Sequence, residues 1–488
     1  MSAARKLIVI GDGVAGALTA AVLARALANT GFEVHLVGTG GEDTSVGPST
    51  MVLTTRPGMA RLHRMIGLDD ERLVQSAGAS FTLGSAWSGW SSVRPTYFVP
   101  FGGAGAKLHG VSFHQLAARL RATGQDLRFG DYTAAPMMAQ SGRFALPPAD
   151  PSNPLAELEH GLHLPAREYR AVLLQRATAF GAQHSRTTYD GVEFAPDGSI
   201  SVVRLADGSR HDAHLVVDAS GIERAVVRQV EDMEWQDWSG LLPCNTWVET
   251  MQATNAAPPL YSHVEALPTG WRMTVPTQGR AVQLFASSGS ADLDPRPGST
   301  VMNAGRLAEP WVGNCVAIGA AAATLDPVHA LPLDLVRSAL ERLLRLLPGT
   351  LPASSEAREY NRETIAELDR SRDLAMVAYR LNARSGESFW DSRRAGEVPE
   401  ELGHKLALYE SRGRVSLLDG DLLDEDEWAL LFDELGLRPR RYDSIADAIP
   451  VEHLQRQFAR MRELTITAIR PLPTHGEYLS AIRRSAAA

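Results

Sequence analysis

The first forty residues follow the order strand, helix, strand in their hydrophobic pattern. Residues 6–10 are a short run rich in β-branched side chains, and residues 16–28 place alanine and leucine at helical spacing. A second β-rich run covers residues 33–37. A strand, a tight turn, a helix and another strand form the opening unit of a dinucleotide-binding sheet. The pattern predicts such a unit here.

Strands and helices continue to alternate over the first two thirds of the chain. Helical spacing marks residues 59–77, 114–122 and 166–181. Strands with glycine-containing turns between them are predicted at residues 187–194, 199–205 and 214–219. Beyond these, helical spacing dominates in residues 333–347, 355–385 and 450–470. We therefore expect interleaved nucleotide-binding and substrate regions in residues 1–330 and a mainly helical region in residues 331–488.

The turn after the first strand reads Gly-Asp-Gly-Val-Ala-Gly, a GxGxxG motif. Gly11 permits the tight turn, Gly13 lets the backbone approach a pyrophosphate, and Gly16 lets the helix pack close to the strand. The start of the helix then faces the anion. The candidate cofactor-binding residues are Gly11, Gly13, Val14, Ala15 and Gly16. The alternative is a glycine-rich turn without a ligand.

The end of the second strand lacks the acidic residue that usually binds the ribose of a dinucleotide. It reads Val37-Gly38, and Glu42 or Asp43 in the following loop is the candidate to replace the carboxylate. Residues 215–221, LVVDASG, resemble the second nucleotide-site element of FAD-dependent monooxygenases. FAD is therefore the expected dinucleotide. Because the chain has one GxGxxG motif, a separate protein is expected to supply the electrons.

Charge and cysteine content disfavour several classes of protein. The 48 basic and 57 acidic side chains give a net charge of −9, which disfavours a broad nucleic-acid-binding surface. Cys244 and Cys315 offer neither a disulfide framework nor a zinc-ligand spacing, so no metal site is predicted. Residues 7–28 resemble a signal peptide, but three turn residues interrupt the apolar stretch and a strand follows at once. We expect a cytoplasmic protein without a membrane segment.

Segments along nearly the whole chain resemble the flavin-dependent tryptophan halogenase family. VGPSTMV at residues 46–52 resembles the family's VGEATIP loop, and residues 66–90 resemble its segment that ends in Asn-Trp. Other matching segments follow in the family's order, at residues 112–124, 142–147, 160–181, 235–245, 313–327, 356–361, 439–449 and 473–479. On these segments the chain is identified as a member of the family.

The resemblance implies a fold and a chemistry. The fold is α/β, with a Rossmann-type FAD domain of the FAD-monooxygenase kind, an interleaved mixed β-sheet substrate region and a mainly helical C-terminal part. In the family, a separate flavin reductase supplies reduced FAD (FADH2), which reacts with oxygen. Halide becomes hypohalous acid, which reaches a lysine beside an indole substrate, and a glutamate assists the substitution. The resemblance also implies cofactor contacts from Pro48, Ser49, Ala320 and Leu333. A homodimer is left open.

The residues that carry halogenation in the family differ here. The family's lysine aligns with Thr82, which has no amine, and its glutamate aligns with His329, which can be a general base near neutral pH. The Ser-Thr pair associated with halide is Ala330-Leu331, and Pro332 lacks a backbone N–H. Thr82 and His329 are the candidate catalytic positions. Family-type halogenation is predicted to be impaired.

Tryptophans are the candidate substrate contacts. The family's WxWxIP motif begins here at Trp271 but has Met273 in place of its second tryptophan. Together with Trp87 and Trp90, Trp271 is a candidate wall of an aromatic pocket, and core packing is the alternative. The loop that resembles VGEATIP has Pro48 in place of its glutamate.

Three functions are compatible with the sequence. The first is an FADH2-dependent oxygenating enzyme that acts on an indole-like or other aromatic substrate, free or on a peptide. The second is a halogenase with a relocated lysine or base, for which Lys107 is a candidate. The third is a non-catalytic protein that binds flavin or an aromatic group of a peptide. The retained cofactor glycines favour the first and make it the preferred function, whereas the missing ribose carboxylate and Pro48 favour the third.

Overall fold

The computed structural model describes residues 5–91, 94–231, 233–289 and 299–487. The chain divides into two compact units, and each is assembled from three separate stretches of sequence. The first unit contains residues 1–79, 164–249 and 286–372. The second contains residues 80–163, 250–285 and 373–488. Each unit is described by itself.

The first unit is built on an eight-stranded sheet with a parallel centre. Strand order is β10-β9-β8-β2-β1-β11-β20-β19, and β8, β2, β1, β11 and β20 run parallel. Their bounds, in chain order, are Arg5–Ile10 (β1), Phe32–Gly38 (β2), Gln183–Phe194 (β8), Ile200–Leu205 (β9), Arg210–Asp212 (β10), Leu215–Asp218 (β11), Trp311–Val312 (β19) and Cys315–Ala317 (β20). This confirms the predicted dinucleotide-type sheet.

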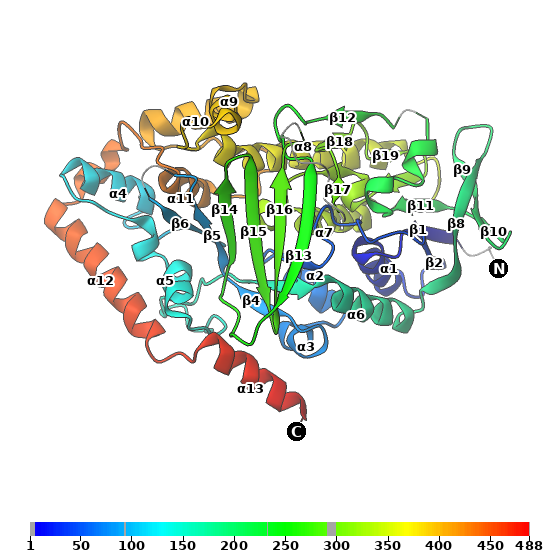
Figure 1. Ribbon diagram of the computed structural model, residues 1–488, viewed down its shortest axis with the longest axis horizontal. Coiled ribbons are helices and arrows are strands. Elements are labelled where there is room, and N and C mark those ends of the chain that lie inside the picture. The colour runs from blue at the N-terminus through cyan, green and yellow to red at the C-terminus, as the bar shows by residue number, and fades with distance from the viewer. Residues whose placement is uncertain (1–4, 92–93, 232, 290–298, 488) are drawn as a thin grey trace. The chain divides into compact units, whose positions relative to one another are not determined.

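Helix α1 (Val14–Ala26) joins β1 to β2 and packs against α6 (Ala166–Ala179) and α7 (Leu331–Leu346). Figure 1 shows α1 beside these strands and α6. The helix is buried from its first residue through Ala24, because alanines on several sides allow close approach of its neighbours. On the sheet, apolar residues such as Ile8, Val216 and Cys315 form a common core. Burial raises the pKa of the Cys315 thiol well above its usual value, so this cysteine is a packing residue.

The second unit contains most of a mixed sheet in the order β13-β16-β15-β14-β5-β6. Neighbours are antiparallel at β14–β15 and β5–β6 and parallel at β14–β5. The bounds are Gly84–Ser88 (β5), Thr96–Pro100 (β6), Thr246–Ala253 (β13), Ser262–Leu267 (β14), Gly270–Thr277 (β15) and Arg280–Ser287 (β16). Short strand β4 (Ser80–Thr82) pairs with β7 (Gly161–Pro165). The sheet strands are the green and blue arrows at the centre of Figure 1.

Helices make up most of the rest of the second unit. Phe113 of α4 (Phe113–Ala122) stacks on Phe458 of α12 (Val451–Ile469), with ring centroids 4.9 Å apart. The capping box of α11 (Glu425–Glu434) is formed by Asp424 and Glu427. The remaining helices are α5 (Ala134–Ser141), α9 (Ser388–Ala395), α10 (Glu400–Arg412) and α13 (His475–Ala487).

The structure differs from the predicted helices at residues 59–77. Two short helices replace the single one, α2 (Met59–Met65) and α3 (Asp70–Ser76). Gly67, at φ 70°, breaks the first, and the Asp69 carboxylate starts the second by accepting a bond from Arg72 N at 2.7 Å. The predicted helices at 355–385 and 450–470 are present as α8 (Ser354–Arg380) and α12.

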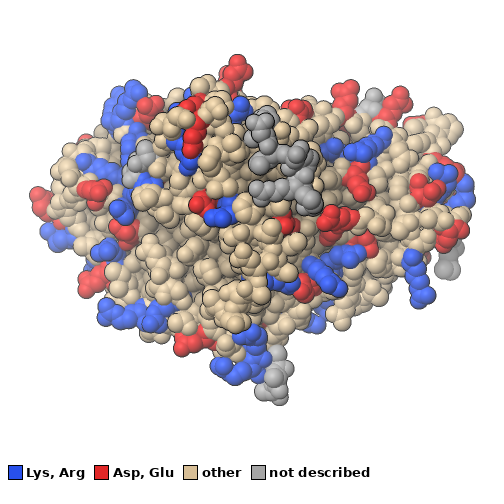
Figure 2. All heavy atoms as spheres, viewed as in Figure 1, with Lys and Arg blue, Asp and Glu red and all other residues tan. Residues whose placement is uncertain are grey.

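The charged side chains are mixed in sign on the face drawn in Figure 2, where neither sign gathers into a broad patch among the described residues. This face therefore offers no single-sign field that would attract a polyanion. Within the same residues, no helix is both long enough and apolar enough to span a bilayer.

Buried imidazoles make stability depend on pH. Burial lowers the pKa of His63 to about 4 and that of His163 to about 3. Below the unfolded-state value of about 6.5 the unfolded chain binds these protons and the native chain does not, so the contribution of these two histidines to stability is greatest above pH 6.5. We expect the free energy of unfolding to fall by up to about 1.4 kcal/mol per pH unit for each such histidine as pH drops below that value.

Urea unfolding at a series of pH values checks this expectation. His63 bonds through Nε2 to the Tyr169 hydroxyl at 2.6 Å, so a His63→Gln chain keeps a polar group there without the titration. The variant should lose less stability on acidification than the wild type. Equal pH slopes in the two chains would contradict the assignment.

Candidate functional site

The glycine turn between β1 and α1 is closely packed. Gly11 has φ 99°, and a Cβ there would lie 2.5 Å from the Ala219 carbonyl oxygen at the end of β11. A Cβ on Gly16 would lie 1.7 Å from the Gly11 carbonyl oxygen. Both positions require glycine because backbone from neighbouring elements occupies the space of any side chain. The turn thus has the form that lets a dinucleotide approach the start of α1.

The first N–H groups of α1 are bonded to the loop that follows β2. Val14 N donates to Asp43 Oδ2 at 2.9 Å, and Ala15 N donates to Ser45 Oγ at 3.1 Å. A Cβ on Gly13 would lie 2.1 Å from Asp43 Oδ1, so the carboxylate lies directly over this glycine. Ser45 O also accepts a bond from Ala320 N at 2.9 Å. The backbone N–H groups of three predicted cofactor-binding residues, Val14, Ala15 and Ala320, therefore donate to the loop that follows β2.

Asp12 is the carboxylate nearest the end of β2. A Cβ on Gly38 would lie 3.0 Å from Asp12 Oδ1. Arg170 donates to Asp12 Oδ2 at 2.6 Å, and His184 Nε2 lies 3.3 Å from the same oxygen. Glu42 is exposed, and Asp43 is engaged at the start of α1. The sequence analysis did not select Asp12 as a carboxylate beside the end of β2, although Asp12 is the middle residue of the GxG turn.

The loop at residues 46–52 is fixed by Glu249 on β13. Ser49 Oγ donates to Glu249 Oε1 at 2.7 Å, while Thr50 N and Thr50 Oγ1 donate to Oε2 at 2.8 and 2.7 Å. Met51 N donates to the same oxygen at 3.1 Å. Pro48 is buried beside them. A carboxylate that accepts four bonds from three successive residues fixes this segment, and no sequence pattern connects positions separated by about 200 residues.

His329 lies in a left-handed turn just before α7. His329 has φ 56° and Ala330 has φ 58°, so two successive non-glycine residues adopt a sparsely populated conformation. Arg56 Nη1 donates to the His329 carbonyl oxygen at 3.2 Å. Burial, together with the positive charge of Arg56, lowers the pKa of the His329 imidazole to about 3. The ring is therefore neutral at pH 7, and Leu333 is buried in the first turn of the helix that follows.

A narrow pocket in the first unit lies between the loop at 46–47, the segment after β20 and helices α7 and α8. Its lining is mostly apolar and consists of Val46, Gly47, Ala317, Gly319, Ala320, Ala322, Ala323, Thr324, Leu325, Pro332, Leu335, Ala339, Thr364, Glu367 and Leu368. The polar side chains in this wall are those of Thr324, Thr364 and Glu367. Segments that carry predicted cofactor contacts thus border one pocket.

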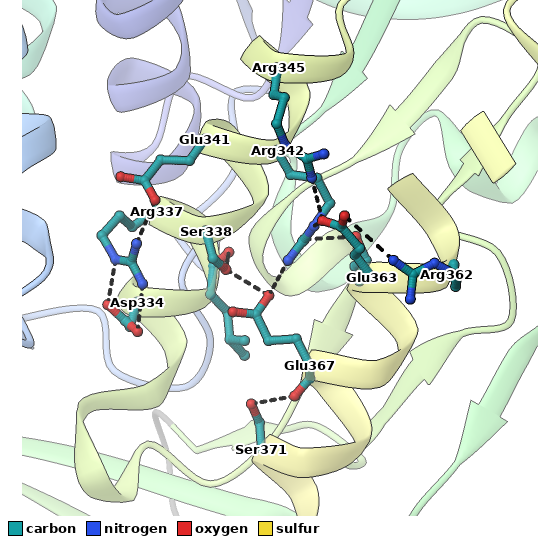
Figure 3. Close-up of polar contacts among 12 residues, drawn as sticks. Asp334, Arg337, Ser338, Glu341, Arg342, Arg345, Arg362, Glu363, Glu367 and Ser371 are labelled. Atoms are coloured by element: carbon teal, nitrogen blue, oxygen red, sulfur yellow. Dashed lines mark hydrogen bonds and ion pairs between the residues drawn. The ribbon is translucent and has the colours of Figure 1, made fainter. Parts of the chain in front are cut away.

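Glu367 belongs to the ionic network drawn in Figure 3, which ties α7 to α8. Its Oε2 accepts bonds from Ser338 Oγ at 2.7 Å and Arg342 Nη2 at 2.9 Å. Burial raises the pKa of the Glu367 carboxyl, although the Arg342 guanidinium opposes that rise. On α7, Arg337 Nε donates to the buried Asp334 Oδ1 at 2.7 Å. The network fixes the wall of the pocket, because loss of one partner would leave a buried charge.

Thr82 belongs to the second unit and lies at the end of β4. The side chain is fully buried, and its hydroxyl donates to the Gly84 carbonyl oxygen at 3.1 Å. His329 belongs to the first unit, so the two candidate catalytic positions belong to different units. Lys107, the candidate replacement lysine, is exposed in the second unit. The catalytic roles of these residues stay predictions.

The three candidate substrate tryptophans are buried in the second unit. Trp90 packs edge to face on Trp87 at 5.1 Å and on Trp390 at 4.8 Å between ring centroids. Trp271 Nε1 donates to the Tyr379 hydroxyl at 2.7 Å. Each of Trp87, Trp90 and Trp271 is at most 1% exposed. Trp87 and Trp90 therefore pack on each other, Trp271 is bonded to Tyr379, and contact of the three rings with a substrate stays a prediction.

The glycine turn has the form that binds FAD, but the Asp43 and Ser45 side chains accept from the N–H groups that FAD would use. The Cβ-free surfaces of the turn suit the close approach of a pyrophosphate. The donors at Val14 and Ala15 that such a group would use are bonded to Asp43 and Ser45. The cradle can therefore accept FAD once these two side chains withdraw.

Comparison with known proteins identifies close structural relatives. The family model described as tryptophan halogenase matches residues 6–451. The tryptophan 7-halogenase RebH of Lentzea aerocolonigenes is 25% identical over 250 residues, which is 47% of this chain and 47% of that protein. The tryptophan 6-halogenase ThaL of Streptomyces albogriseolus is 23% identical over 450 residues, covering 85% of this chain and 83% of that protein. The solved structure of BrvH, a flavin-dependent halogenase from Brevundimonas sp. BAL3, superposes with a TM-score of 0.92 at 27% identity over 98% of this chain and 99% of that one.

Loss of Glu249 should release the loop at residues 46–52. Bonds to a charged acceptor contribute about 1.5–3 kcal/mol each when they are lost singly. We therefore expect Glu249→Ala to raise amide hydrogen exchange in peptides covering this loop by about tenfold or more. Glu71→Ala, which removes an exposed carboxylate of the same unit, is the matched control. Unchanged exchange in the Glu249 variant would contradict the clamp.

Proposed function

The chain belongs to the tryptophan halogenase family, and from this premise we propose that it is an FAD-dependent oxidoreductase that oxidises an indole-like or other aromatic substrate. The observation that carries the proposal is the match of the family over residues 6–451 together with the near-complete superposition on a flavin-dependent halogenase. The electrons come from a separate flavin reductase. The substrate is a free aromatic molecule or an aromatic side chain of a peptide.

The first unit supplies the residues that would hold FAD. Gly11 and Gly16 permit the tight turn and the close packing of α1, and Gly13 would let the pyrophosphate approach. Val14 and Ala15 would offer their N–H groups to it once the Asp43 and Ser45 side chains withdraw. When bound and reduced, FAD supplies the activation of oxygen, which no side chain can supply alone. Glu249 keeps Ser49 and its neighbours in place, so the wall formed by this loop stays ordered.

Oxygenation is the preferred outcome because the halogenation residues are replaced. The hydroxyl of Thr82 is committed to the Gly84 carbonyl oxygen, and threonine has no amine that could hold hypohalous acid. Ala330 and Leu331 offer no hydroxyl donors to a halide. With these groups absent, we propose that the oxidised product carries oxygen in place of halogen.

His329 acts in this proposal as a neutral polar group. A pKa of about 3 makes its imidazole a weak base at neutral pH, because proton transfer is most efficient when the pKa lies near the working pH. The neutral ring can still hold a substrate or a water by a hydrogen bond. We therefore propose that His329 orients a substrate or a water and does not transfer a proton.

Two other functions are each supported by an observation. Halogenation with relocated residues is supported by the resemblance to BrvH, whose title describes a flavin-dependent halogenase. A non-catalytic role is supported by the bonds from Val14 and Ala15 to Asp43 and Ser45, because these bonds compete with a cofactor.

Turnover with bromide present separates these functions. Purified chain is supplied with FAD, a flavin reductase, oxygen, bromide and either tryptophan or an indole-containing peptide, and the product mass is measured. The proposal predicts a product heavier by one oxygen atom, formed equally without bromide. A brominated product would contradict the argument from Thr82 and Ala330, and the absence of flavin binding would support the non-catalytic function.

The pH dependence of that turnover tests the role of His329. Because the ring stays neutral far below pH 7, kcat/KM should show no imidazole inflection between about pH 5 and 9. His329→Gln should lower kcat/KM while leaving the shape of the profile unchanged. An inflection near pH 6.5 that disappears in the variant would show that His329 transfers a proton.

A further inference from the structure

The segment between β2 and the loop at 46–52 places a negative charge at the start of α1. Asp43 Oδ2 accepts from Val14 N at 2.9 Å, and Oδ1 accepts from Ser45 N at 3.1 Å and Ser45 Oγ at 2.6 Å. Ser45 in turn accepts from Ala15 N. A carboxylate is stabilised at a helix N-terminus by the unpaired N–H groups and by the helix dipole. The chain therefore supplies its own anion at this position.

The same position is the one that the glycine turn offers to a pyrophosphate. The carboxylate lies where a Cβ of Gly13 would be, and Gly13 is the glycine whose missing side chain allows the pyrophosphate to approach. The Asp43 carboxylate and a pyrophosphate cannot both accept from Val14 N, and the Ser45 hydroxyl takes the N–H group of Ala15. Binding of one therefore requires the other to leave.

We propose that Asp43 is an internal competitor of the cofactor and sets its affinity. The inference rests on the proposed FAD-dependent function. With Asp43 in place the site cannot accept the pyrophosphate, so the observed dissociation constant is the intrinsic value divided by the fraction of molecules in which the segment has withdrawn. Asp43 thus weakens binding of FAD even though it contacts no part of it.

The structure confines the movement to a short segment. Glycines lie on both sides of Asp43, at positions 38, 40, 41 and 47, and Gly40 and Gly47 have φ of 78° and 111°. Beyond them, the Glu249 carboxylate holds Ser49 through Met51. Asp43 can therefore leave α1 while the loop at 46–52 keeps its place.

Cofactor titration of the full chain tests the proposal. FAD, and separately ADP as a probe that lacks the flavin ring, are titrated into the wild type, Asp43→Ala and Asp43→Asn by calorimetry. Removing one competing charged hydrogen bond should tighten binding by about tenfold in Asp43→Ala. Asp43→Asn keeps the shape and loses the charge, so it should show a smaller gain. Without ligand, amide exchange in residues 38–47 should be faster in Asp43→Ala than in the wild type.

Glu71→Ala is the control, because it removes one negative charge from an exposed position on helix α3 of the same unit. Tighter binding in the Asp43 variants alone supports the proposal. Equal or weaker binding in Asp43→Ala overturns it and assigns Asp43 to contact with the cofactor or to no role. If ADP and FAD bind to none of the chains, the FAD-dependent function fails, and the competitor role fails with it.

Discussion

The N–H groups at the start of α1 need an acceptor, and the identity of that acceptor decides what the first unit does. The turn of Gly11, Gly13 and Gly16 brings these donors to the edge of the parallel sheet, and Asp43 Oδ1 lies 2.1 Å from the position of a Cβ on Gly13. Asp43 and Ser45 accept from them in the described structure. A dinucleotide would accept from the same groups. The proposed cofactor binding depends on the exchange of one acceptor for another.

Around this point the first unit is held by carboxylates that reach across the sequence. Asp12 accepts a hydrogen bond from Arg170, and Glu249 accepts hydrogen bonds from Ser49 and Thr50. Glu367 closes one wall of the pocket through Ser338 and Arg342. Because these acceptors are charged, removing any one of them costs more than removing a neutral hydrogen-bond partner. These carboxylates fix the surroundings of the site, and glycines flank the segment that carries Asp43.

Local pattern predicts the elements well, and distant pairing decides the site. The βαβ opening follows from periodicity and three glycines, and the helices α8 and α12 follow from apolar spacing. The break at Gly67 was missed because an isolated glycine in a helical pattern is often tolerated. The contact between Asp43 and Val14 could not be predicted, because the path of the loop after β2 decides which donor the carboxylate reaches. The contacts of Glu249 and Asp12 could not be predicted either, because only folding brings β13 to the loop at 46–52 and the glycine turn to the end of β2.

If Asp43 competes with FAD for the N–H group of Val14, the two cannot occupy the start of α1 together. A crystal structure of the full chain grown with FAD is the decisive measurement. The pyrophosphate should lie on the N–H groups of Val14 and Ala15, with the Asp43 carboxylate withdrawn from both Val14 and Gly13. FAD bound while Asp43 remains on Val14 N would show that the two do not compete.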